Sequence, residues 1–140
     1  MKTARVLIAA TTFVAAIALA GCADTDFPRP QPSNTAATVD VTDQPGSVEG
    51  YVGALDDAAI TLCAVEDGVL RVEGTVTNPV AEPQDYRIYV SALVGTETTG
   101  LVQVDITDVS DGATQPWATQ IESVADGAEC VLRVERFATQ

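Results

Sequence analysis

Few residues in this chain could carry covalent chemistry, and three of them are cysteines: Cys22, Cys63 and Cys130. The chain has no histidine, which excludes a Ser-His-Asp triad, a Cys-His pair and imidazole metal ligands. Its one lysine is Lys2, and no glycine-rich phosphate loop is present. Paired carboxylates serve glycosidases, but among 20 acidic residues some pair always lies close. A domain of about 90 residues also has little room for an enclosed cleft. We therefore predict that the protein is not an enzyme.

The best candidate for a metal site is the acidic run Asp105, Asp108 and Asp111, which Gly112 follows. Carboxylate oxygens are the ligands that calcium prefers. The spacing departs from the EF-hand loop, where ligands occupy alternate positions before the glycine. On a strand, Asp105 and Asp108 would also face opposite sides. We expect no cofactor and keep the three residues as weak calcium candidates.

Cys22 follows a segment with the features of a secretory signal. Lys2 and Arg5 precede an apolar run over residues 6–20, and small residues lead into the cysteine. An apolar run of up to ~15 residues is short for a permanent membrane helix, which needs roughly 20. Residues 1–21 are therefore predicted to be a signal peptide.

The four residues Leu19-Ala20-Gly21-Cys22 resemble the lipobox of bacterial lipoproteins. The resemblance implies cleavage before Cys22, a diacylglyceryl group on its sulfur and often a further N-acyl chain such as palmitate. Two acyl chains anchor a protein stably, whereas one is marginal. The expected location is the extracytoplasmic face of the cell membrane. An ordinary signal peptide followed by a cysteine is the alternative.

Cys63 and Cys130 remain for the folded part of an exported chain. An oxidising compartment favours a disulfide between them. Closing a loop of this length stabilises a domain by about 4 kcal/mol in the chain-entropy model. Two free structural thiols are the alternative. Metal ligation is disfavoured, because no histidine and no nearby cysteine is available.

Acidic residues dominate the charge. The whole chain carries −13, and removal of Lys2 and Arg5 with the signal peptide would leave −15. Such a surface repels nucleic acid and anionic lipid head groups, so we predict no nucleic-acid partner. A solvating surface and adaptation to high salt both remain open as reasons for the acidity.

Residues 22–46 are predicted to be a disordered tether. They hold four of the seven prolines, with serine, threonine and aspartate among the rest. Apolar residues are too sparse to offset the entropy of ordering. The Pro-X-Pro-X-Pro stretch at residues 28–32 favours extended polyproline II, so we expect a semi-rigid base.

From residue 47 to residue 140 the pattern changes to short runs in which apolar and polar residues alternate. This alternation predicts half-buried strands. The clearest runs are 70–77, 86–93, 102–107 and 130–135, the weaker ones are 60–65 and 117–123, and part of 48–55 is a possible seventh. A turn of helix fits within 52–59. Strands at this spacing predict an all-β fold, an immunoglobulin-like antiparallel β-sandwich of six to seven strands.

An ordered set of motifs runs through these strands. It comprises Val72-Glu73-Gly74-Thr75-Val76-Thr77-Asn78, Asp85-Tyr86-Arg87-Ile88-Tyr89-Val90-Ser91, Val109-Ser110-Asp111-Gly112 and the late Cys130. The set resembles the FxLYD-type family of small immunoglobulin-like domains found on many actinobacterial lipoproteins. The resemblance covers about residues 58–137, and residues 90–94 depart from the motif that names the family. It implies a fold and no particular activity.

Four of the matched or nearby residues are expected to be architectural. Gly74 would make room for a neighbouring strand or for the disulfide, or mark a bulge. Asn78 would bond its own backbone in a turn. Tyr86 and Trp117 would fill the core while their polar atoms reach backbone partners.

Two functional classes remain. The first is an interaction module of the cell envelope that presents a sheet face or loops to a protein or a glycan, with Tyr89, Leu93 and Phe137 as exposed candidate contacts. The second is an accessory protein that binds a small ligand or an ion such as calcium. That class needs an apolar pocket, and the chain has few aromatic residues to line one.

Overall fold

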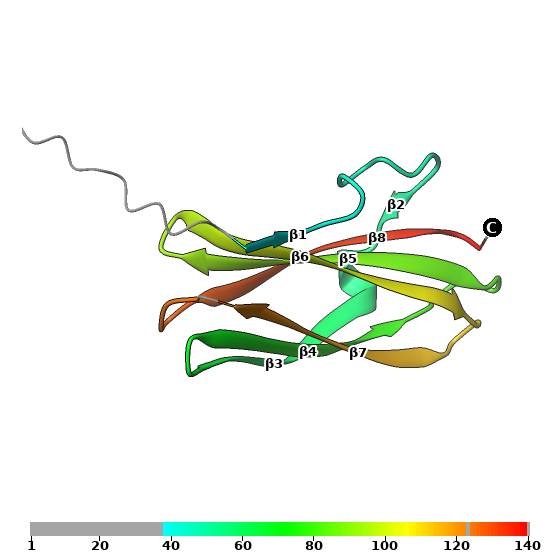
Figure 1. Cartoon of the computed structure of the whole chain (residues 1–140). Coiled ribbons are helices and arrows are strands. Elements are labelled where there is room, and N and C mark those ends of the chain that lie inside the picture. The colour runs from blue at the N-terminus through cyan, green and yellow to red at the C-terminus, as the bar shows by residue number, and fades with distance from the viewer. Residues whose placement is uncertain (1–37, 123, 140) are drawn as a thin grey trace, which may run out of the picture. The chain divides into compact units, whose positions relative to one another are not determined.

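The computed structural model describes residues 38–122 and 124–139, which form an all-β sandwich of two layers (Figure 1). The elements are β1 (Thr38–Asp40), β2 (Val52–Gly53), η1 (Leu55–Asp57), β3 (Ala58–Glu66), β4 (Val69–Thr77), β5 (Gln84–Val94), β6 (Glu97–Val109), β7 (Thr114–Glu122) and β8 (Glu129–Ala138). One sheet has the order β1-β6-β5-β8-β2 and the other the order β3-β4-β7. The predicted all-β sandwich is confirmed. All six predicted strands are present. β2 lies where a seventh strand was expected, and the 3-10 turn η1 lies where a helical turn was expected.

The alternation along the strands explains which side chains form the core. On β4, Leu70, Val72, Gly74 and Val76 are buried, while Arg71, Glu73 and Thr75 between them are exposed or only partly covered. The inward residues of β5 and of β7, including Ile88 and Ile121, close the space between the sheets. Burying each of these large side chains stabilises the fold by about 1.5–3 kcal/mol.

Gly74 lets the indole of Trp117 lie against the backbone of β4. A Cβ atom at Gly74 would lie 2.3 Å from Cζ2 of Trp117 and 2.4 Å from the carbonyl oxygen of Ala59. The predicted role of this glycine in making room is confirmed. The expectation for Trp117 is only half right, because its indole is buried but its Nε1 atom has no hydrogen-bond partner.

Asn78 holds the turn between β4 and β5. Its side-chain nitrogen donates to the carbonyl groups of Glu82 and Val109, each at 2.8 Å, and its Oδ1 accepts from the backbone N–H of Val80 at 3.0 Å. These bonds satisfy a side chain that is fully buried. The predicted turn role of Asn78 is confirmed.

The N-terminal boundary of the fold lies earlier than expected. β1 pairs in parallel with β6, Thr38 lying opposite Gly100, so the larger sheet is mixed rather than wholly antiparallel. The prediction of a disordered tether over residues 22–46 is therefore wrong from residue 38 onward. The predicted signal peptide, Cys22 and the rest of that tether lie outside the described residues. Within the described part, no helix is long and apolar enough to cross a membrane.

Candidate interaction surface

Residues 41–51, which we call the strap, cross the outer face of the five-stranded sheet. They connect β1 at one edge of that sheet to β2 at the other, on the side away from the three-stranded sheet (Figure 1). The backbone N–H of Asp43 donates to Oε1 of Gln103 on β6 at 2.9 Å. The Asp43 carboxylate pairs with Arg87 on β5, also at 2.9 Å. The strap is therefore held to the central strands by both backbone and side-chain groups.

Tyr89 is buried beneath the strap, contrary to the expectation that it would be an exposed contact residue. Its side chain points outward from β5, yet the residue is only 2% exposed. Its hydroxyl donates to the carbonyl of Asp43 at 3.0 Å, and burial raises its pKa. Of the other two expected contacts, Leu93 and Phe137 are only partly exposed, and Phe137 packs under the guanidinium of Arg87.

Glu135 fixes the strap to β8. It is 1% exposed, and its Oε1 accepts from the backbone N–H of Gly46 at 2.8 Å. The same oxygen pairs with Arg133 at 2.8 Å, and this hydrogen bond raises the pKa of the arginine. The second oxygen, Oε2, is buried without a hydrogen-bond partner. The outer face of the sheet thus holds a buried carboxylate that the strap and one arginine together stabilise.

A cluster of three polar side chains, Asp57, Tyr86 and Arg136, connects η1 to the sandwich. The hydroxyl of Tyr86 donates to Oδ2 of Asp57 at 3.0 Å, and Arg136 on β8 forms an ion pair with the same oxygen. Burial raises the pKa of Tyr86 to about 12, and the neighbouring carboxylate adds to the shift. All three groups satisfy one another, so this cluster positions η1 and does not present reactive groups.

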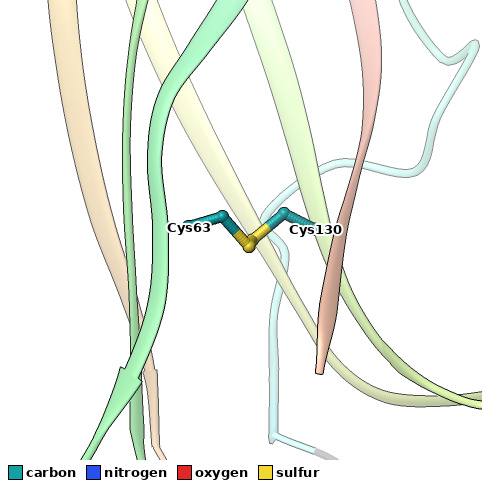
Figure 2. Close-up of a disulfide and its surroundings, with 2 residues drawn as sticks. All are labelled: Cys63 and Cys130. Atoms are coloured by element: carbon teal, nitrogen blue, oxygen red, sulfur yellow. A yellow bond between two sulfur atoms is a disulfide. The ribbon is translucent and has the colours of Figure 1, made fainter. Parts of the chain in front are cut away.

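A disulfide joins the two sheets. Figure 2 shows the side chains of Cys63 on β3 and Cys130 on β8 meeting between the layers. The two Cα atoms are 6.2 Å apart. The predicted bridge is confirmed, and the alternative of two free thiols is wrong.

The structure does not gather the acidic residues that were weak calcium candidates. Both carboxylate oxygens of Asp105 are engaged, one by Arg87 and one by Gln103, each at 2.8 Å. Asp108 lies in a bulge with a φ of 56°, and Asp111 lies in the turn after β6. No group of three potential metal ligands occurs among residues 38–122 and 124–139. The three carboxylates are kept apart by the bulge at Asp108 and by the ion pair of Asp105 with Arg87. The spacing of these residues in the sequence reveals neither feature.

Every arginine in the described part is already paired with a carboxylate. The pairs are Arg71 with Glu66, Arg87 with Asp43 and Asp105, Arg133 with Glu135, and Arg136 with Asp57. These four arginines are outnumbered by eighteen acidic residues, of which only five are in ion pairs. The surface therefore offers anionic ligands no unpaired arginine in this part of the chain, and its field attracts cations.

An open groove of about 790 Å³ runs beside β8 at the point where β2 ends. It is lined by residue 51, residues 53–56 and residues 132–135. Leu55 is 55% exposed and Tyr51 is 37% exposed. Sequence reasoning missed this groove, because the sequence does not show that β2 ends after two residues.

No protein-family model matches the chain, and the comparisons with curated proteins and with solved structures also gave no match.

Proposed function

We propose that the protein is an exported lipoprotein whose β-sandwich is an interaction module that binds a cationic protein of the cell envelope. Lipid on Cys22 would anchor it to the extracytoplasmic face of the membrane. The lipobox-like residues support the anchor. The FxLYD-type resemblance supports the assignment to small domains carried by such lipoproteins.

The observation that carries the choice of partner is the charge balance of the described residues. All four arginines are engaged in ion pairs, and most of the carboxylates are not. Charge complementarity of this kind speeds association and selects partners of opposite sign. No comparable observation favours the accessory protein for a small ligand or ion. The acidic candidates are dispersed, and the groove is open where a ligand carrier needs an enclosing pocket.

The interaction is tested in cells with the full chain. A photo-crosslinking amino acid is placed at Leu55, at Leu62 on β3 or at Gln120 on β7, all of which are exposed. The proposal predicts a discrete adduct with a basic protein from at least one of these faces, weakened by added salt. Absence of any specific adduct from all three positions would overturn the interaction module.

The anchor is tested separately. A clickable palmitate analogue should label the wild-type chain and partition it into the detergent phase. The Cys22→Ala variant should lose both the label and the membrane association, because no acyl chain can attach. Labelling that persists in this variant, or its absence from the wild type, contradicts the anchor.

A further inference from the structure

The outer edge of β8 is largely without a neighbouring strand. β8 runs from Glu129 to Ala138, but β2 pairs with it only at Glu135 and Arg136. One further bond, from the N–H of Ala54 to the carbonyl of Val134 at 2.9 Å, ends this contact. The β8 edge over residues 129–133 is thus unpaired in the described part of the chain.

Alternation along the strand shows which backbone groups face this edge. The backbone of Arg136 and the carbonyl of Val134 point toward β2. In a strand, every second residue presents its N–H and C=O groups to the same side. The groups of Leu132 and Cys130 therefore point the same way, into the space that β2 does not reach.

One end of the groove lies along this edge, at Leu132 and Arg133. Four consecutive residues, 132–135, line it, and consecutive side chains of a strand point to opposite faces. The groove therefore reaches the unpaired edge at Leu132 and Arg133, whereas Val134 and Glu135 already have Ala54 and Gly53 as neighbours. The apolar side chains of Leu55 and Tyr51 also line it.

The remaining sheet edges are protected in familiar ways. β1 has three residues and β2 has two. β7 carries Pro116, and β3 has a bulge between Ile60 and Leu62. Short strands, prolines and bulges are the devices that prevent strand addition. The unpaired part of β8 has no proline and no bulge, and of the charged residues that can also protect an edge it carries Glu129 and Arg133.

We infer that the β8 edge at residues 129–133 binds an extended, lysine- or arginine-bearing segment of a partner protein by strand addition. The inference rests on the proposed function and specifies its mode. Backbone hydrogen bonds to Leu132 and Cys130 would supply affinity, as in other strand-addition complexes. Asp56 and Glu129 beside the edge are exposed and lack an arginine partner within the described residues, so they select a basic segment. A second copy of this chain would bring its own excess of carboxylates and be repelled.

The test uses the full mature chain with amide resonances assigned, and synthetic peptides of alternating lysine and valine, roughly six residues long. We expect the lysine-valine peptide to change the chemical shifts of the amides of residues 129–134 and 53–56. At saturating peptide, hydrogen exchange of the Leu132 and Cys130 amides should slow about tenfold. A glutamate-valine peptide should not bind. The Leu55→Gln variant should weaken binding several-fold, whereas the matched control Leu62→Gln on β3 should not.

N-methylated peptides separate strand addition from simple charge attraction. A lysine-valine peptide methylated only on its valine amides keeps one unmodified edge and should still bind. The same peptide methylated on every amide should not bind. If the fully methylated peptide binds as well as its parent, strand addition is wrong while the proposed attraction of a cationic partner survives. Failure of every peptide to bind, or concentration-dependent dimers that occupy β8, would also overturn the inference.

Discussion

The hydroxyl of Tyr89 donates to the backbone carbonyl of Asp43 across 3.0 Å, joining the middle of β5 to a residue 46 positions earlier in the chain. This bond buries a side chain that the pattern of β5 directs away from the core. It shows that the strap is a third layer over part of the larger sheet. The polar segment before residue 47 therefore contributes to the stability of the domain.

Replacing Tyr89 with phenylalanine should lower the free energy of unfolding by about 1 kcal/mol, because it removes this hydrogen bond from the partly buried carbonyl of Asp43. Urea unfolding measures the change. The matched control is Tyr51→Phe, whose exposed hydroxyl lies 3.5 Å from Arg133, and it should change stability by less than about 0.5 kcal/mol. Equal effects of the two substitutions would contradict the role given to Tyr89.

Deleting residues 22–46 should destabilise the domain by about 3 kcal/mol, since it removes β1 and the strap contacts of Asp43 and Gly46 and exposes Tyr89. Deleting residues 22–33 is the control and should leave the unfolding midpoint unchanged, because the described fold begins at Thr38. The two truncated proteins are compared by denaturant unfolding. If both are as stable as the chain of residues 22–140, the strap is not part of the fold.

Gly74→Ala should destabilise the protein by about 2–3 kcal/mol, because the new methyl group would overlap Trp117 and the rigid backbone at Ala59. Gly53→Ala supplies the comparison. An added Cβ at Gly53 meets nothing within 4 Å, so the expected change is within about 0.5 kcal/mol. Thermal unfolding of both variants decides the matter, and a neutral Gly74→Ala would show that the indole can move aside.

The raised pKa of Tyr86 predicts a loss of stability at alkaline pH. Burial raises this pKa to about 12, above its ordinary value of 10.0. The folded state therefore holds the phenolic proton more tightly than the unfolded state. The resulting stabilisation is complete below pH 10 and is lost as the pH rises toward 12, by an amount of about 2 kcal/mol. Urea midpoints should fall over this range in the wild type and fall less in Tyr86→Phe. Parallel pH profiles for the two proteins would refute the assignment.

Loss of the disulfide should cost about 4 kcal/mol in the chain-entropy model, because Cys63 and Cys130 are 67 positions apart. The double variant Cys63→Ala/Cys130→Ala isolates this effect. Its unfolding midpoint, measured without reductant, should match that of the reduced wild type. A double variant as stable as the oxidised wild type would mean that the bridge does not restrict the unfolded chain.

The alternating strands could be predicted from the sequence because each has one face in the core, as β4 shows with Leu70, Val72 and Val76. Gly74 and Asn78 were also predictable, since their roles depend on local backbone geometry. The strap was not predictable. Its residues are polar, and it is held by Gln103, Arg87 and Glu135, which lie far away in the sequence.

Contacts between segments far apart in the sequence also explain why the prediction of an exposed Tyr89 was wrong. Alternation places this residue correctly on the outer face of β5, but it cannot report that another segment covers that face. The groove was missed for a related reason. It exists because β2 ends after two residues, and strand length is set by pairing with β8 rather than by local composition.

The position of the disulfide divides the domain into two parts with different modes of opening. The covalent loop from Cys63 to Cys130 encloses the whole of β4, β5, β6 and β7, whereas the strap and β1 lie outside it. The strap can therefore detach as a sub-global unit, a foldon, while the loop and the core remain closed. In native-state hydrogen exchange, the amides of Asp43 and Gly46 should exchange through this partial opening well before those of β4 and β5. Such an opening would expose Tyr89 and Glu135 transiently, giving the outer face of the sheet a hidden state that the closed domain does not display.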